Sequence, residues 1–194
     1  MVKKKKNIGV RQYIETYYPK YAGWFTYSPE QCAPIRSTTD KWAILHNMTP
    51  CIVVVDGVTF KSTETLFQLF RFRNPEAVKN VYHQNNKLQA KHWIKLGFSR
   101  PDWGKMFLDA LKYVLMVKYE QCEAFRQELE RSKGLFIVED ESNRRSTSYG
   151  VQLKESGLYE GSNLLGRLLM ELRDKGKLDY TLPDDAFMFL QYLK

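Results

Sequence analysis

The longest periodic segment of the chain, residues 102–121, constrains the fold more than any other stretch. Its apolar side chains recur at the spacing of a helix that buries one face. The side chains of that face are Met106, Phe107, Ala110, Leu111, Val114, Leu115, Met116 and Val117. A second strong helix is predicted at residues 163–175, where leucines share one face and Gly176 is suited to end the helix. Two such helices require a core built largely from helices.

Shorter segments complete the prediction of an α+β, predominantly helical fold. Further helices are predicted at residues 75–83, 87–96, 123–133 and 184–193, and a helix or an irregular arm at 11–20. Short strands are predicted at residues 24–27, 52–55 and 135–138, where apolar runs are bounded by turn-forming residues. Residues 29–41 and 140–162 have loop composition, and the second is predicted to be a long loop before the penultimate helix.

Length and composition favour one globular domain. The chain has 194 residues, of which 43% are hydrophobic, so we expect a basic N-terminal tail or arm over residues 1–22 and a single compact domain over 23–194. No apolar run approaches the roughly 18 residues of a membrane span, and no secretory signal is recognisable, so no membrane partner is expected. The three cysteines show no metal-ligand or CxxC spacing, which favours a reduced, cytoplasmic protein.

The net charge suggests an anionic partner. The formal charge is +8, and Lys3–Lys6 carry about half of that excess. Such a tail is attracted to phosphates on a nucleotide or on nucleic acid, which makes nucleic acid a possible carrier of the substrate. The alternative is that the lysines form only a solvated tip, as charge runs at chain ends usually do. The sequence gives no indication of the oligomeric state.

Most familiar catalytic motifs are missing from the sequence. There is no phosphate-binding P-loop, no GxGxxG and no GxSxG. His46, His83 and His92 lack the spacing of metal ligands, so we expect neither a metal nor a cofactor. The acidic residues that have aromatic neighbours are therefore the main candidates for chemistry.

Glu64 is the most conspicuous of these acids. It follows the predicted strand 52–55 and the turn at Asp56-Gly57, in the first turn of a short helix that Ser62 or Thr63 is placed to cap. The helix dipole favours a negative charge there. Gln68 lies one turn further along the same face of the helix. The alternative is that Glu64 is only a first-turn acid with no other role.

Several segments, taken in order, resemble the NADAR, or YbiA-like, N-glycosidase family. The resemblance spans roughly residues 45–175 and depends on the order and spacing of its motifs. Those motifs are Leu45–Cys51, Ile52–Gly57 followed by Ser62–Gln68, Trp103, Met116–Gln121, and Gly161–Arg173 with its sequence GSNLLGRLLMELR. Known members of the family hydrolyse N-ribosyl bonds. Some act on early riboflavin-pathway ribosylaminopyrimidine phosphates, and others remove ADP-ribose from guanine in nucleic acid.

The resemblance implies a catalytic role for Glu64. Cleavage of a C–N glycosidic bond passes through an oxocarbenium-like ribose, so positive charge develops at the anomeric carbon. A fixed carboxylate stabilises that charge or orients the attacking water. Both roles suit an ionised Glu64 better than the role of general acid.

The resemblance also implies a set of substrate-binding residues. Asn47 and Gln68 would contact ribose hydroxyls, and Trp103 and Tyr149 would stack on a base. Exposed N–H groups at Asn163 would hold a phosphate. The full expected binding set is Asn47, Gln68, Arg71, Trp103, Tyr149, Gly150, Asn163 and Gly166. The alternatives are a turn at Asn47, core packing at Trp103 and Tyr149, a helix cap at Asn163 and close packing at Gly166.

The chain also departs from the family pattern. His46 and Met48 replace a serine and a phenylalanine. The family's loop acid and Trp-Gly are matched only by Tyr149-Gly150, which follow Arg144-Arg145; this arginine pair favours a more anionic ligand such as a diphosphate.

Three hypotheses follow. The first is an N-glycosidase for a phosphorylated N-riboside or an ADP-ribosyl conjugate. The second is a catalytically silent ADP-ribose or nucleotide-binding module. The third and weakest is a nucleic-acid-binding protein that uses the basic tail. If Asp140, Glu141 or Glu160 reaches the site, the second hypothesis weakens.

Overall fold

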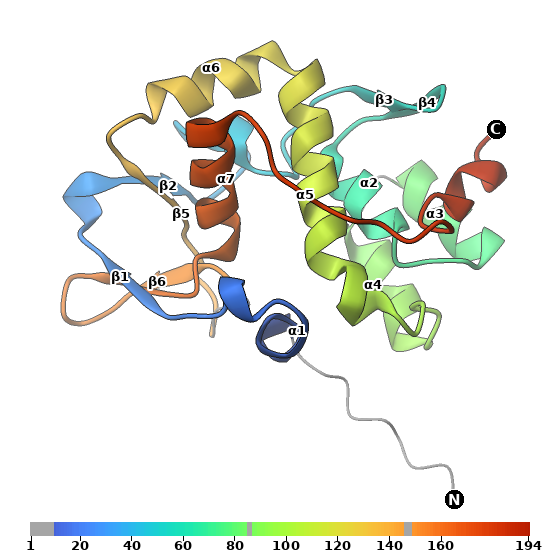
Figure 1. Cartoon of the computed structure of the whole chain (residues 1–194), viewed down its shortest axis with the longest axis horizontal. Helices are drawn as coiled ribbons and strands as arrows, with labels where there is room; N and C mark the ends of the chain where they lie inside the picture. The colour runs from blue at the N-terminus through green and yellow to red at the C-terminus, as the bar shows by residue number, and fades with distance from the viewer. Residues whose placement is uncertain (1–9, 85–86, 146–148) are drawn as a thin grey trace, which may run out of the picture.

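The computed structural model describes residues 10–84, 87–145 and 149–194. The predictions for Lys3–Lys6 and for residues 146–148 therefore lie outside the described residues. Within these ranges the fold is α+β and predominantly helical, as the sequence predicts (Figure 1). The helices are α1 Val10–Tyr17, α2 Thr63–Leu69, α3 Pro75–Gln84, α4 Lys87–Lys95, α5 Trp103–Gln121, α6 Glu123–Arg131 and α7 Leu164–Lys175.

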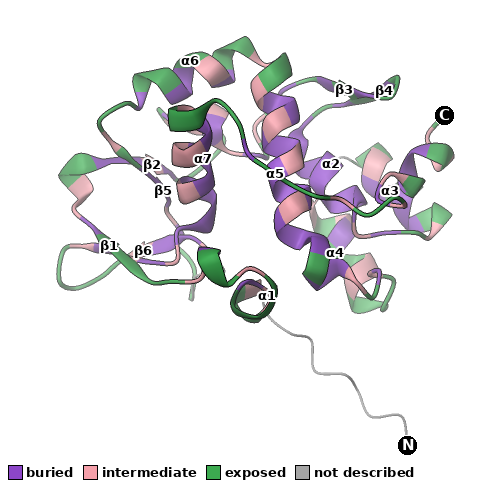
Figure 2. Ribbon diagram, in the orientation of Figure 1, coloured by how far each residue is buried: buried purple, intermediate pink, exposed green. Residues whose placement is uncertain are grey.

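Helix α5 is the central element of the molecule. It contacts α1, α2, α6 and α7. It runs between α7 with the strands of residues 25–35 and 136–161 on one side, and α2–α4 with the hairpin of residues 53–60 on the other (Figure 1). Its apolar stripe is buried as predicted except at Met116, which is half-buried, and buried residues line the inward faces of the surrounding helices (Figure 2). Helix α7 ends as predicted at Gly176, whose φ of 71° is left-handed. None of the described helices is long and apolar enough to cross a bilayer.

The described strands are short and form three small sheets. An antiparallel sheet has the order β1-β7-β6, β2 pairs with β5 in parallel, and β3 and β4 form a hairpin. Their bounds are β1 Phe25–Tyr27, β2 Cys32–Ile35, β3 Val53–Val55, β4 Val58–Phe60, β5 Phe136–Glu139, β6 Val151–Leu153 and β7 Tyr159–Gly161. The turn predicted at Asp56-Gly57 connects β3 and β4, with positive φ angles at both residues.

The prediction of a loop over residues 29–41 is wrong for the first half of that segment. Residues 29–31 form the 3₁₀ helix η2 (Pro29–Gln31), and β2 follows it. Pro34 lies within β2, in register with Val138 of β5. A proline is tolerated there because β2 has a single strand neighbour, so one of its edges needs no N–H donors.

The long loop predicted over residues 140–162 is also partly wrong. It contains β6 and β7, which pair with each other, and β7 pairs in addition with β1. The glycines that indicated a loop allow the strands to pack closely: a Cβ on Gly161 would lie 2.2 Å from the backbone oxygen of Gly150.

The C-terminal helix predicted at residues 184–193 is not an α-helix. The segment consists of turns and the 3₁₀ helix η4 (Met188–Tyr192). Phe187 and Phe189 both pack against Phe70, with ring centroids 5.3 Å and 5.1 Å away. Tertiary packing of alternate aromatic residues therefore overrides the helical preference of this segment.

Candidate active site

Glu64 lies at the start of α2, directly after the β3–β4 hairpin. The Oγ atom of Ser62 accepts a hydrogen bond from the backbone N–H of Thr65, so Ser62 is the predicted helix cap. Every residue of α2 is buried, and Glu64 is only 7% exposed. A buried carboxylate needs hydrogen-bond or ion-pair partners that offset the free-energy cost of removing its charge from water.

The partners of Glu64 come from two helices. Its Oε1 atom accepts a hydrogen bond from Nε2 of Gln68 at 2.8 Å and forms an ion pair with Nζ of Lys87, in α4, at 3.3 Å. Its Oε2 atom makes no hydrogen bond within the described part of the chain. Glu64 therefore keeps one oxygen for a water molecule or a substrate.

The loop before the hairpin packs onto the start of α2. The backbone oxygen of Asn47 accepts a hydrogen bond from the N–H of Glu64 at 3.0 Å, and its Oδ1 accepts one from Oγ1 of Thr63 at 3.3 Å. Lys118 fixes the same loop, since its Nζ donates to the backbone oxygens of Ile44 and His46. Burial lowers the pKa of this fully buried lysine to about 8.

His46 belongs to the same loop and lines the site. From the sequence it was predicted not to be a metal ligand and to replace a serine of the family motif. Its Nδ1 accepts a hydrogen bond from the backbone N–H of Met48 at 2.9 Å, and burial lowers its pKa. The neutral imidazole therefore carries its proton on Nε2.

Glu139, at the end of β5, is a site residue that the sequence analysis missed. Its Oε2 atom is buried and has no hydrogen-bond partner within the described residues. Burial, reinforced by the charge of Glu141, raises the pKa of Glu139 to about 7. The available signal was its position as the first acid after a buried strand, at Glu139-Asp140-Glu141.

Glu64 and Glu139 line the same small cavity, which we call the inner pocket. Its volume is about 10 Å³, which fits about one water molecule. Its other lining residues are His46, Asn47, Phe67, Lys87, Leu111, Tyr149 and Leu165. The inner pocket thus combines Glu64, one oxygen of which is held by Gln68 and Lys87, with Glu139, whose buried Oε2 has no partner among the described residues.

The acids that the sequence analysis considered as substitutes do not line the inner pocket. Asp140 is held by Arg36 and by the hydroxyl of Tyr159. Glu141 pairs with Arg144 and accepts a hydrogen bond from the N–H of Gly150. Glu160 lies in β7.

Three expected binding residues are not among the lining residues of these pockets: Asn163, Gly150 and Gly166. The side chain of Asn163 accepts a hydrogen bond from the N–H of Glu139 at 3.2 Å and donates one to the oxygen of Ile137 at 2.8 Å. A Cβ on Gly150 would lie 2.4 Å from the oxygen of Glu139, and one on Gly166 would lie 2.1 Å from that of Ile137. These three residues hold the strand that carries Glu139.

A larger pocket adjoins the inner pocket, and we call it the cationic pocket. Its volume is about 620 Å³, and it shares Phe67, Lys87 and Tyr149 with the inner pocket. Its cationic lining residues are Arg71, Lys87, Lys91 and Arg144, and none of its described lining residues carries a carboxylate. Such a lining is suited to a ligand that bears phosphate.

Arg71 and Trp103 form one wall of the cationic pocket. The guanidinium group of Arg71 lies 4.7 Å from the ring centroid of Trp103, and its Nε atom is buried without a hydrogen-bond partner among the described residues. Burial lowers the pKa of Arg71. Trp103 is 3% exposed and packs against Phe67 and Phe107. Arg71 thus occupies a face of the indole that a base would need for stacking.

Tyr149 lies where the pockets meet. It lines both the inner and the cationic pocket. Its ring packs edge-on against that of Phe107, with ring centroids 6.0 Å apart. Burial and the nearby carboxylates raise its pKa well above the ordinary value, so the phenol keeps its proton. The structure therefore places six of the expected residues around these two adjoining pockets: Glu64, Asn47, Gln68, Arg71, Trp103 and Tyr149.

Comparison with known proteins identifies the family and a similar fold. The NADAR domain model matches residues 27–176. Over 144 residues the chain is 26% identical to the N-glycosidase YbiA of Shigella boydii serotype 4 and to that of Escherichia coli K12, covering 72% of this chain and 84% of each relative. The NMR structure of E. coli YbiA aligns with a TM-score of 0.58 at 23% identity, over 75% of this chain and 84% of that chain. This last match bears on the fold alone.

Proposed function

The chain belongs to the NADAR domain family, and from this premise we propose that it is an N-glycosidase, a hydrolase that cleaves the C–N bond of an N-riboside with Glu64 as the key carboxylate. One observation carries the proposal: Glu64 and Glu139 line one water-sized pocket at the edge of a cation-lined one. The relatives that match over most of their length are named N-glycosidases, which supports the same activity.

The geometry suggests a division of labour between the two acids. The inner pocket is too small for a sugar, so the ribose would lie in the cationic pocket, with its anomeric carbon facing Glu64. The free oxygen of Glu64 would stabilise the positive charge that develops at that carbon. Asn47 and Gln68, which lie beside Glu64, would contact the ribose hydroxyls.

Glu139 is suited to be the general base. A buried carboxyl group whose pKa is about 7 exists in both protonation states at neutral pH, which suits proton transfer. The oxygen of the attacking water bonds to the anomeric carbon, and its proton moves to the unpartnered Oε2 of Glu139. The electron pair of the broken C–N bond stays on the nitrogen, which takes a proton from solvent in the open cationic pocket.

The cationic pocket supports a phosphorylated substrate. The positive side chains around it favour a phosphorylated N-riboside or an ADP-ribosyl conjugate over a neutral nucleoside. Arg71 would take a phosphate oxygen through the donor that has no partner in the described structure. The hypothesis of a silent binding module was based on the missing loop acid, and Glu139 offers a replacement for that acid.

A hydrolysis assay tests the proposal. The protein would be incubated with a ribosylaminopyrimidine phosphate and with an oligonucleotide that carries ADP-ribosylated guanine, and the products would be identified by mass spectrometry. We expect release of ribose 5-phosphate or of ADP-ribose from one of them. The first product would indicate a metabolite glycosidase, and the second an enzyme that acts on nucleic acid.

The variant Glu64→Gln keeps the shape of the side chain and removes its charge. We expect its rate to fall about a thousandfold, because a carboxylate that acts in the transition state contributes effects of this order. Glu76→Gln is a matched control, since Glu76 is an exposed acid in the first turn of α3. If neither substrate is cleaved, or if Glu64→Gln cleaves as well as the wild type, the binding-module hypothesis replaces this one.

A further inference from the structure

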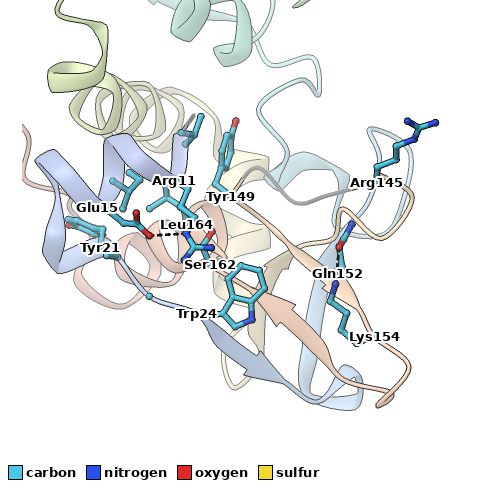
Figure 3. Close-up of a pocket in the computed structure, with 14 residues that line it drawn as sticks. Arg11, Glu15, Tyr21, Trp24, Arg145, Tyr149, Gln152, Lys154, Ser162 and Leu164 are labelled. Carbon is cyan, nitrogen blue, oxygen red and sulfur yellow. Dashed lines mark hydrogen bonds and ion pairs between the residues drawn. The ribbon is translucent and has the colours of Figure 1, made fainter. Parts of the chain in front are cut away.

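A third pocket lies beyond Tyr149, and we call it the Trp24 pocket. It has a volume of about 580 Å³ and is lined by residues of α1, of the segment 21–24, of β6 and of the start of α7. In Figure 3, Tyr149 and Trp24 lie at opposite ends of the pocket, Arg11 and Glu15 at one side, and Gln152 and Lys154 at the other. Val10 and Tyr149 line both this pocket and the cationic pocket, so the two adjoin.

The Trp24 pocket offers an exposed aromatic ring. Trp24 is 52% exposed, which is unusual for the largest side chain, and the guanidinium group of Arg11 lies 5.9 Å from its ring centroid. Arg11 is itself paired with Glu15 at 2.8 Å. An indole placed in a pocket beside a cation is suited to stack on a planar group.

Two further cations of this pocket have no counter-ion among the described residues. Arg145 lies at its rim and makes no hydrogen bond or ion pair with any other described residue. Nζ of Lys154 donates only to the amide oxygen of Gln152, at 3.0 Å, so its charge is not balanced by a described acid. Two unbalanced cations that line the same pocket as an exposed indole fit a ligand that is both planar and anionic.

We propose that the Trp24 pocket binds a nucleotide unit, with its base against Trp24 and its phosphate at Arg145 and Lys154. The volume lies within the range of sites for small molecules and cofactors, about 300–1,000 Å³. Because this pocket meets the cationic pocket at Tyr149, one ligand can extend into both. The substrate then carries its N-ribosyl bond at Glu64 and a nucleotide at Trp24. This extension rests on the proposed function, whereas nucleotide binding by the pocket does not.

Calorimetric titrations with AMP and with ribose 5-phosphate test the site without any catalysis. We expect the two ligands to bind together, because they occupy different pockets. In the variant Arg145→Ala/Lys154→Ala, and separately in Trp24→Ala, the affinity for AMP falls about tenfold or more, because each loses a charge-assisted or stacking contact. The affinity for ribose 5-phosphate stays as in the wild type in both variants.

The double variant Lys79→Ala/Lys95→Ala is the matched control. Both lysines are exposed and lie outside the described pocket linings, so their removal changes the net charge by the same amount and leaves AMP binding intact. Thermal melts of all variants establish that they are folded. The site is ruled out if AMP does not bind, if its affinity is unchanged in the pocket variants, or if ribose 5-phosphate displaces it.

The nucleotide unit can belong to a diphosphate-linked ligand or to a nucleic-acid strand. Titrations with ADP-ribose and with a short 5′-phosphorylated oligonucleotide separate these sources. Binding of either ligand at this pocket supports the site. The ligand whose affinity drops in the pocket variants identifies the source of the nucleotide unit. If AMP binding behaves as expected while no substrate is hydrolysed, the proposed function fails and the nucleotide site stands. If a substrate is hydrolysed but AMP does not bind, the nucleotide site fails and the proposed function stands.

Discussion

The two walls of the inner pocket differ in how the chain builds them. The helix wall consists of the loop 46–48, α2 and α4, and it carries Glu64. The contacts of Glu64 and its helix join residues fairly near one another in the sequence, such as Asn47 with Thr63 and Glu64 with Gln68, although the distant Lys118 also holds the loop. The strand wall consists of β5 and the start of α7, and it carries Glu139, which is in register with Ile35 of β2, far away in the chain.

The two walls also hold their acids differently. One oxygen of Glu64 is held by Gln68 and Lys87, whereas Glu139 forms no ion pair with a described residue and its buried Oε2 has no hydrogen-bond partner among them. A buried carboxyl group without a hydrogen-bond partner lowers the free energy of unfolding. The protein retains such a group only where the surrounding structure holds it in place. The comparison indicates that the helix wall supplies a fixed charge and the strand wall a group that exchanges a proton.

The largest effect on folding is expected from Asn163→Ala, which damages the strand wall. Asn163 is fully buried, bonds the backbone of β5 twice, and has a φ of 46° that alanine adopts poorly. We expect the free energy of unfolding to fall by about 3 kcal/mol, through lost hydrogen bonds and backbone strain. Urea denaturation followed by circular dichroism measures this.

Asn163→Gly separates the two causes, because glycine tolerates the left-handed conformation without the amide contacts. We expect it to recover about 1 kcal/mol of the loss and to leave the rest. If the glycine variant is as stable as the wild type, the amide of Asn163 does not hold the strand wall, and the contrast between the walls is weaker than described.

A smaller effect is expected from Arg71→Ala, which alters the helix side of the site without touching either acid. We expect KM for the phosphorylated substrate to rise about tenfold and kcat to change little, because a charge-assisted contact to a phosphate is lost. Steady-state kinetics on the substrate and on its dephosphorylated form measure the effect. A fall in kcat that is equal for both forms would show that Arg71 acts through packing on Trp103 and does not bind phosphate.

The contrast between local and long-range contacts also explains which parts of the fold could be predicted from the sequence. The periodicity of α5 and α7, the turn at Asp56-Gly57 and the cap at Ser62 depend on neighbouring residues, and all were predicted. Strands β6 and β7 were interpreted as a loop, because strands of three residues beside glycines are too short to show an alternation of apolar and polar residues. They exist through pairing with each other and with β1.

Glu139 was missed for the same physical reason. In the sequence it is one of three consecutive acids that end a strand, and only its place as the first of them distinguishes it from Asp140 and Glu141. Its burial follows from the parallel pairing of β5 with β2 and from the contact with Asn163. Glu64 was identified because its helix start and the resemblance pointed to the same residue.

The most direct test of the account is the pH dependence of kcat/KM for the wild type and for Glu139→Gln. Glu139 acts as a base in its ionised form, so wild-type kcat/KM should rise with pH through about 7, where its raised pKa lies. The variant should be about a hundredfold slower and should lack this rise, while Glu160→Gln keeps the wild-type profile. A variant with the wild-type rate, or with the same rise near pH 7, would contradict a site built from one fixed and one proton-exchanging carboxyl group.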